Sequence, residues 1–136
     1  MLYVFSGLPS TGKSTISRAL AARLGAVWLR IDSLEVALQA SHMAVEDIAD
    51  GGYAAARAVA ADNLALGRGV VADSVNPIAL TRDPWAEVAR RGAHPLREVE
   101  IVCSDRDEHR RRIEARQPAG PDWRTVCARR YDPWSR

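Results

Sequence analysis

The sequence contains a single lysine, Lys13, so 18 of its 19 basic residues are arginines. Without a second lysine, the chain cannot contain the Asn-Lys-x-Asp motif with which some nucleotide-binding proteins read guanine. No lysine elsewhere could form a Schiff base, and a polylysine tail is also excluded. Because lysine is so scarce, the position of the one lysine, close to the N-terminus, is informative.

Cysteine is almost as scarce, because the chain has only Cys103 and Cys127. Two cysteines are too few for a disulfide framework, and their spacing fits no metal-binding motif. We therefore expect a reducing, cytoplasmic location. The apolar residues 1–5 have no basic stretch before them, and Gly7 and Pro9 interrupt the run. Neither a signal peptide nor a membrane span is expected there.

The length of 136 residues suits one compact domain, and we expect a single domain over residues 1–136. Its charge is distributed unevenly. Residues 1–105 carry 10 basic and 12 acidic side chains, whereas residues 106–136 carry 9 basic and 5 acidic ones. The C-terminal quarter is therefore rich in arginine. A solvated helix face with ion pairs explains such a region as well as an anion-binding surface does.

Short apolar runs alternate with helical patterns, which predicts an α/β fold built on a parallel sheet. The predicted strands cover residues 2–6, 26–31, 69–72 and 98–103. The predicted helices cover residues 13–24, 33–40, 53–66, 83–91, 106–117 and 123–130. On the first helix, the apolar spacing predicts that Ile16, Ala19, Leu20 and Leu24 face the core. Three of the four strands lead into a polar residue, at the edge where open α/β sheets bind ligands.

The lone lysine lies in the run Gly7-Leu8-Pro9-Ser10-Thr11-Gly12-Lys13-Ser14, which fits the phosphate-binding pattern G-x-x-x-x-G-K-[ST]. Glycines allow backbone N–H groups to turn inward around phosphate oxygens, and the following helix adds its positive end. A glycine-rich connecting turn is the alternative, but a strand precedes the run and a helix follows it, as the motif requires.

The residues predicted to bind nucleotide in this loop, called the P-loop below, are Gly7, Pro9, Ser10, Thr11, Gly12, Lys13, Ser14 and Thr15. We expect Lys13 to contact the β- and γ-phosphates of ATP, and Ser14 to be a ligand of Mg²⁺.

Two aspartates follow the second and third predicted strands. Asp32 is predicted to accept the proton of an acceptor hydroxyl, although a helix cap is the alternative. Asp73 follows the apolar run Val70-Val71-Ala72, as in a Walker B strand. We expect Asp73 to hold Mg²⁺ directly or through water, with a turn-forming aspartate as the alternative.

The arginine-rich helix after the fourth strand supplies the last candidates. Arg112 and Arg116 are four residues apart and share one helix face. The planar, permanent charge of arginine suits a phosphoryl group in transfer. A break rich in proline and glycine follows, so residues 106–130 are predicted to form a lid that closes over the phosphates and excludes water. Ion pairs with Glu108 and Glu114 are expected on its other face.

The remaining polar and aromatic residues give weaker predictions. His42, His94 and His109 share no recognisable spacing, and we expect each to be a surface or loop residue. Trp28 and Trp85 are expected in the core.

The order of these segments resembles the small P-loop kinases of the polynucleotide-kinase, zeta-toxin and chloramphenicol-phosphotransferase group. The segments are the P-loop, Asp32, the run Asp73-Ser74-Val75-Asn76-Pro77, and the basic helix after Cys103-Ser104-Asp105. The resemblance spans about residues 2–134. It implies a three-layer P-loop NTPase fold with strand order 2-3-1-4-5, and ATP-dependent phosphorylation of a hydroxyl.

The same resemblance implies roles for single residues. Asp32 matches the general base of the group, and Lys13 matches its P-loop lysine. Arg112 and Arg116 match the region of the lid arginines. In the group, a fifth strand and a last helix follow the lid, whereas here no apolar run remains. We therefore expect four strands and an open edge beside the strand at 98–103, where two copies could pair as a homodimer.

Together these features predict an ATP- and Mg²⁺-dependent phosphotransferase acting on a small-molecule hydroxyl, with residues 34–53 as the best candidate for acceptor contacts. A nucleic acid with a 5′-hydroxyl is a less favoured acceptor, because it needs a basic track with stacking aromatics, which only the C-terminal quarter offers. A nucleotide-binding module or ATPase without kinase activity is the other alternative. No membrane partner is expected.

Overall fold

The computed structural model describes residues 1–76, 79–117 and 119–130. Strands and helices alternate along the chain. In chain order, the elements are β1 (Leu2–Ser6), α1 (Lys13–Leu24), β2 (Val27–Arg30), α2 (Ile31–Ala40), α3 (Gly51–Ala65), β3 (Val70–Asp73), α4 (Ala79–Arg91), β4 (Leu96–Glu100), α5 (Arg106–Ala115) and α6 (Trp123–Arg130).

The four strands form one parallel sheet in the order β2-β3-β1-β4. This confirms the predicted α/β class and the predicted order of the first four strands. Because β1 and β3 are central, the P-loop after β1 lies next to the end of β3, and Phe5 is in register with Asp73. Residues 131–136, where no fifth strand was expected, lie outside the described part of the chain.

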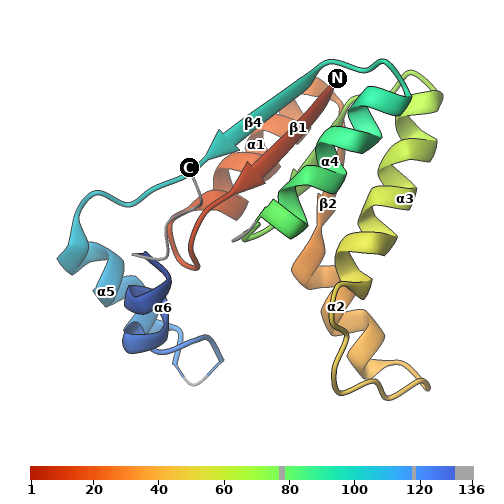
Figure 1. Ribbon diagram of the computed structural model, residues 1–136. Coiled ribbons are helices and arrows are strands. Elements are labelled where there is room, and N and C mark those ends of the chain that lie inside the picture. Colours follow the sequence, from red (N-terminus) through yellow and green to blue (C-terminus); the bar gives the residue numbers. More distant parts are fainter. Residues whose placement is uncertain (77–78, 118, 131–136) are drawn as a thin grey trace.

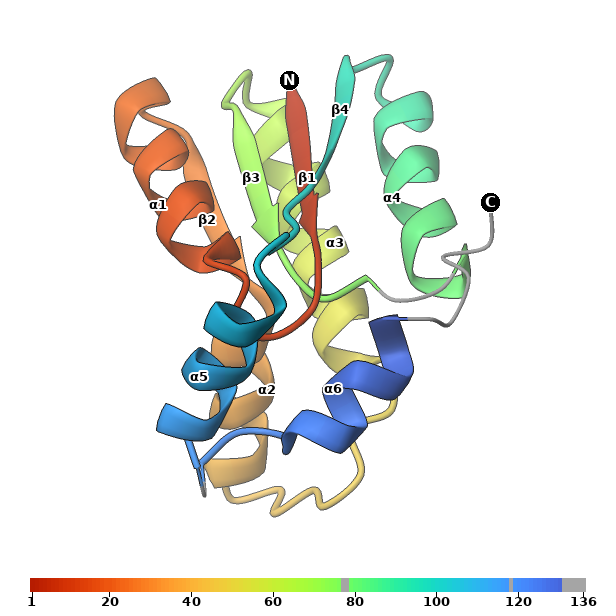
Figure 2. The ribbon, with the colours of Figure 1, turned by 90° about the vertical axis from the view of Figure 1, so that its left-hand side faces the viewer.

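Helices cover both faces of the sheet, giving the three layers predicted (Figure 1, Figure 2). Side chains alternate between the faces along each strand. Leu2 and Val4 of β1 pack in the cluster that includes α3 and α4, together with Trp85. Phe5 packs on the other side against Ala21 of α1. Trp85 is fully buried, as predicted, whereas Trp28 is only partly buried.

The inner face of α1 differs from the prediction. Ser17 and Ala21 are its buried residues, whereas Ile16 and Leu24 are about half exposed. Ser17 can be buried because its hydroxyl donates to the Ser14 carbonyl at 3.2 Å and accepts the indole N–H of Trp28 at 3.1 Å. A hydroxyl that both donates and accepts a hydrogen bond costs little free energy to bury. Serine can therefore occupy a buried position where periodicity alone predicts an apolar residue.

Several element boundaries also differ. Helix α2 begins at Ile31, so Asp32 lies in its first turn rather than at the end of a strand. Helix α4 begins at Ala79 and contains Pro84 in its interior, although Pro84 was expected at its start. Strand β4 ends at Glu100, three residues before the predicted end.

Helices α5 and α6 lie together beyond the carboxyl ends of the strands (Figure 2). Asp105 caps α5 by accepting the backbone N–H groups of Asp107 and Glu108, both at 3.0 Å. Asp122 likewise accepts the N–H of Thr125 at 2.7 Å at the start of α6. In the part of the chain that is described, no helix is long and apolar enough to cross a membrane.

Candidate functional site

The P-loop has a backbone shape that only glycine allows at two points. Gly7 has φ 143°, and a β-carbon there would collide with the carbonyl oxygen of Ile101. Gly12 has φ 94° at the N-cap of α1. Within the loop, the Thr11 hydroxyl donates to the Leu8 carbonyl at 3.0 Å. The loop is therefore folded into a tight turn by its own contacts, at the positive end of α1.

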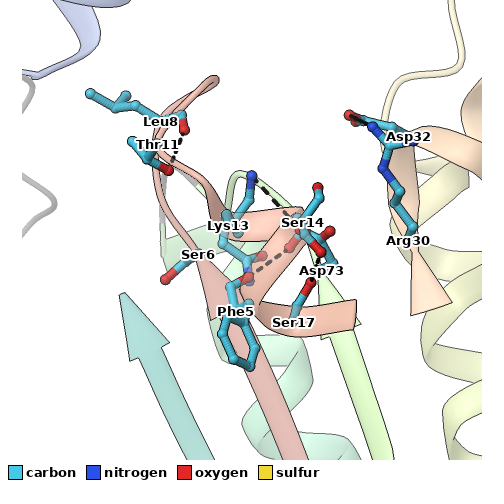
Figure 3. Close-up of polar contacts among 12 residues, drawn as sticks. Phe5, Ser6, Leu8, Thr11, Lys13, Ser14, Ser17, Arg30, Asp32 and Asp73 are labelled. Carbon is cyan, nitrogen blue, oxygen red and sulfur yellow. Dashed lines mark hydrogen bonds and ion pairs between the residues drawn. The ribbon is translucent and has the colours of Figure 1, made fainter. Parts of the chain in front are cut away.

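Lys13 and Asp73 form an ion pair at the base of the loop (Figure 3). The Lys13 ammonium nitrogen lies 3.7 Å from Asp73 Oδ1, and the two side chains are 11% and 2% exposed. Asp73 reaches this position because β3 runs next to β1. Its second oxygen, Oδ2, is buried without a hydrogen-bond partner among the described residues. A buried carboxylate oxygen with no partner is a ready acceptor for a cation or a bound water.

The donor set at this point fits Mg²⁺. Mg²⁺ in nucleotide sites is held through one or two protein oxygens, with phosphates and waters filling the other positions. Asp73 offers the unpartnered Oδ2, and Ser14 lies on the wall of the adjacent cleft. No group of three or more His, Cys, Asp or Glu side chains that could hold a metal alone occurs among the residues described. The site therefore suits a cation that arrives with a nucleotide.

A second charged pair lies at the end of β2. Arg30 Nη2 is 3.8 Å from Asp32 Oδ2, and Figure 3 shows this pair separate from the Lys13–Asp73 pair. Asp32 is 58% exposed and Arg30 is 36% exposed, so water or a ligand can reach both. Burial, and secondarily the Asp32 charge, raises the pKa of Glu35 one helical turn further along α2.

Tyr53 of α3 is linked to the chain after β3. Its hydroxyl oxygen accepts the backbone N–H of Asn76 at 3.1 Å. Burial is the main cause that raises the pKa of Tyr53, with smaller contributions of the same sign from Glu35 and Asp32. Asn76 is fully buried and has φ 46°. These contacts hold the segment after Asp73 against α3, a role of Tyr53 that was not predicted from the sequence.

Helix α5 and its C-cap residue contact the P-loop through three side chains. Arg116 Nη1 donates to the Ser10 hydroxyl at 3.1 Å. Arg112 Nη1 lies 3.9 Å from the point where a β-carbon on Gly12 would stand, and Arg112 Nε donates to Glu108 at 2.8 Å. His109 Nε2 lies 2.8 Å from the Pro9 carbonyl oxygen.

His109 was predicted to be a surface or loop residue, and this is wrong. Its side chain is 1% exposed. The only sequence signal was its place four residues before Ile113, which puts the two side chains on the same face of α5. His42 is exposed, as predicted, and His94 is partly buried in the turn before β4. Glu108 does bind arginines, and these bonds to Arg111 and Arg112 hold its pKa at about 2.

These elements enclose a cleft of about 1100 Å³. Its walls come from the P-loop and the start of α1, from the end of β2, and from α5 with the segment after it. The lining residues are 9–16, Arg30, Asp32, Val75, Arg111, Arg112, Ala115, Arg116, Ala119, Gly120 and Pro121.

The cleft brings together most of the residues predicted from the sequence. Residues 9–15 of the P-loop, Asp32, Arg112 and Arg116 all line it. Gly7 does not line the cleft. Its backbone N–H donates to the Val75 carbonyl at 3.2 Å, which joins the P-loop to the segment after β3. Asp73 also lies behind the wall and contacts the cleft through Lys13. Arg30 also lines the cleft, although no role was predicted for it from the sequence.

Comparisons with known proteins agree with this fold. Residues 2–132 match the profile of a protein family described as an AAA domain. A candidate kinase from Chloroflexus aurantiacus superimposes with a TM-score of 0.71 at 23% sequence identity, and the match covers 85% of this chain and 65% of that one. This chain therefore spans slightly less than two thirds of that relative.

Two further solved structures have the same fold. Kti12 from Chaetomium thermophilum, determined with ADP-AlF3, has a TM-score of 0.70 at 20% identity, covering 95% of this chain and 79% of its own. A gluconokinase from Sinorhizobium meliloti has a TM-score of 0.60 at 21% identity, covering 93% and 73%. At such identities the likeness shows the fold of P-loop kinases and nothing finer. No curated protein matches the sequence.

Proposed function

The chain belongs to the AAA domain family and has the fold of the small P-loop kinases, and on that basis we propose that it is an ATP-dependent phosphotransferase that acts on a small-molecule hydroxyl. One observation carries the proposal. A single cleft is lined by the P-loop with Lys13, by the carboxylate of Asp32, and by Arg112 and Arg116. These are the groups that phosphoryl transfer needs, because its catalysis is mostly positioning and charge stabilisation.

On the nucleotide side, the P-loop N–H groups and the positive end of α1 bind the phosphates of ATP. Lys13 moves its ammonium from Asp73 toward the β- and γ-phosphates, which its flexible stem allows. Ser14 and Asp73 would hold Mg²⁺, which neutralises charge on the β- and γ-phosphate oxygens when bound. Arg112 and Arg116 form part of a lid over residues 106–130, and they bring fixed positive charge to the transferring group.

On the acceptor side, Asp32 is the proposed general base. It accepts the proton of the acceptor hydroxyl as the hydroxyl oxygen forms its bond to the γ-phosphorus and the bond to the β-phosphate oxygen breaks. Arg30 keeps the Asp32 carboxylate oriented across their 3.8 Å contact. Residues 34–53 follow Asp32 and are the proposed source of acceptor contacts.

The size of the cleft supports a small acceptor. Small-molecule sites have volumes of roughly 300–1000 Å³. A cleft of about 1100 Å³ therefore has room for a nucleotide and a compact second substrate. The likeness to a gluconokinase supports the same class. The low cysteine content supports a cytoplasmic location, and pairing of two copies along β4 stays a prediction.

Replacing Asp32 with asparagine tests the proposal. We expect Asp32→Asn to lower phosphoryl transfer by about 10²- to 10⁴-fold, the usual contribution of a general base, while the affinity for Mg-ATP changes little. Asp62→Asn, on the exposed side of α3, is the matched control and should transfer normally. Unchanged turnover in Asp32→Asn, or loss of its ATP binding, would contradict the assignment of the base.

The acceptor class is tested by measuring ADP release from wild-type protein with a panel of hydroxyl metabolites and with a 5′-hydroxyl oligonucleotide. Stimulation by a metabolite, with little dependence on salt, is the expected result. An oligonucleotide whose affinity falls steeply with salt would instead identify a nucleic-acid kinase. ADP release that no acceptor stimulates would indicate an ATPase or a nucleotide-binding module.

A further inference from the structure

His109 joins helix α5 to the P-loop across 100 residues of sequence. The Nε2 atom of its ring lies 2.8 Å from the Pro9 carbonyl oxygen. A carbonyl oxygen only accepts hydrogen bonds, so the contact requires a proton on Nε2. The other ring nitrogen, Nδ1, is buried and has no partner among the described residues. A proton on Nδ1 would therefore be left without an acceptor.

The ring also packs against helix α6. Trp123 of α6 meets it edge to face, with ring centroids 5.5 Å apart and an angle of 89° between the planes. Ile113, one turn further along α5, is also buried. The backbone N–H of His109 donates to the Asp105 carbonyl at 3.0 Å in the first turn of α5. The orientation of the donor that faces Pro9 is therefore supported by packing against α6.

We propose that His109 is a positioning residue that orients the Pro9–Ser10 peptide of the P-loop for phosphate binding. In a trans peptide the C=O and N–H bonds point in opposite directions. Because His109 holds the Pro9 carbonyl on its side, the Ser10 N–H of the same peptide points away from the ring. Ser10 lines the cleft, and this orientation makes its N–H a donor for a phosphate oxygen.

The conformation at this point needs support. Ser10 has φ 62°, a left-handed value that costs a residue with a side chain of its size about 1 kcal/mol. Proline before it offers no N–H of its own, so the loop has one donor fewer than its length suggests. His109 holds the carbonyl before Ser10, and Arg116 holds the Ser10 hydroxyl at 3.1 Å. His109 of α5 and Arg116 at its C-cap therefore contact the two residues that this peptide joins.

The inference rests on the proposed function only in requiring that the cleft binds a magnesium nucleotide. The test therefore measures binding and not transfer. His109→Phe keeps an aromatic ring against Trp123 but removes the donor. His109→Gln keeps an N–H at about the reach of Nε2. His94→Phe is the matched control, because His94 lies in the turn before β4, at the opposite end of the strands from the cleft.

Calorimetric titration with Mg-ADP is the primary measurement. His109→Phe should weaken binding by about tenfold, the equivalent of one lost hydrogen bond, whereas His109→Gln should stay within about threefold of wild type. His94→Phe should bind normally. Wild-type affinity in His109→Phe would overturn the inference. The inference would also be overturned if both His109 variants bound Mg-ADP equally weakly, in proportion to their loss of thermal stability. His109 would then have a packing role only.

The wild-type protein offers a second measurement that does not depend on how a variant folds. Long-range ¹H–¹⁵N NMR spectra report which ring nitrogen of a histidine carries the proton. A proton on Nε2 of His109, together with a shift of the Ser10 amide signal when Mg-ADP is added, is the expected result. A proton on Nδ1 alone would overturn the inference. If the wild type binds Mg-ADP but no acceptor is ever phosphorylated, the proposed function fails while the role of His109 stands.

Discussion

Replacing Lys13 with methionine should weaken the folded state even when no nucleotide is bound. Lys13 forms an ion pair with the buried carboxylate of Asp73 at 3.7 Å, and Asp73 is 2% exposed. The second oxygen of Asp73 already lacks a partner among the described residues. Methionine keeps most of the length and packing of lysine, so the main loss in Lys13→Met is the charge that compensates Asp73.

The size of the effect follows from the burial of the pair. Two unit charges at this separation attract each other by about 4 kcal/mol at an effective dielectric constant of about 20. Removing one partner of a buried pair costs roughly 3–5 kcal/mol, because the other charge stays buried and uncompensated. Since the Lys13 side chain is 11% exposed and partly screened, we expect a loss of about 3 kcal/mol. For a chain of this length that corresponds to a melting temperature lower by about 10 °C.

The assay is urea unfolding of a double-mutant cycle made of Lys13→Met, Asp73→Asn and the double variant. Asp73→Asn alone should cost less than Lys13→Met, because the long Lys13 stem can carry its ammonium to the solvent of the cleft. The double variant should recover most of the stability lost in Lys13→Met, with a coupling energy of about 2 kcal/mol. A double variant as unstable as Lys13→Met, or a Lys13→Met midpoint equal to that of wild type, would refute the reasoning.

Two predictions concern the pH dependence of stability. Because the pKa of Glu35 is raised in the folded state, ionised Glu35 disfavours folding, and its contribution to stability falls as pH rises through that raised pKa. Glu35→Gln should therefore raise the melting temperature at pH 7 but not below about pH 4, and an equal gain at every pH would contradict this. The pKa of Glu108 is lowered from 4.5 to about 2, so its contribution is complete above about pH 4.5 and is lost as pH falls toward 2. The stability difference between wild type and Glu108→Gln should follow that course in urea titrations, and a difference that persists at pH 2 would argue against it.

The parts of the fold that could be predicted from sequence depend on local patterns. The P-loop carries its glycines, its lysine and its helix within a short run, so its position needed no long-range information. The helix predicted over residues 13–24 spans Lys13–Leu24, whereas the strand order followed from the resemblance and not from a local pattern. The P-loop and this helix are fixed by neighbours in the chain, and neighbours are what a sequence displays directly.

The features that could not be predicted depend on contacts between distant residues. His109 was assigned to the surface, but its burial results from Pro9, 100 residues earlier, and from Trp123 on the next helix. Ser17 was not recognised as a core residue, because its hydroxyl is satisfied by Trp28 on another element. Periodicity ranks residues by polarity alone, so it misassigns a polar side chain whose partners come from elsewhere in the fold.

The strand order separates the two halves of the proposed site. The P-loop follows the central strand β1, and Asp73 ends the central strand β3. Arg30 and Asp32 lie at the end of β2, which pairs with β3 alone among the described strands. Residues 41–50 then connect α2 to α3 without entering the sheet. The proposed phosphate-binding residues and the proposed acceptor-binding residues are therefore carried by different elements of the fold. If residues 34–53 supply the acceptor contacts, as proposed, exchange of residues 41–50 for another loop should change acceptor preference while the central strands keep their packing.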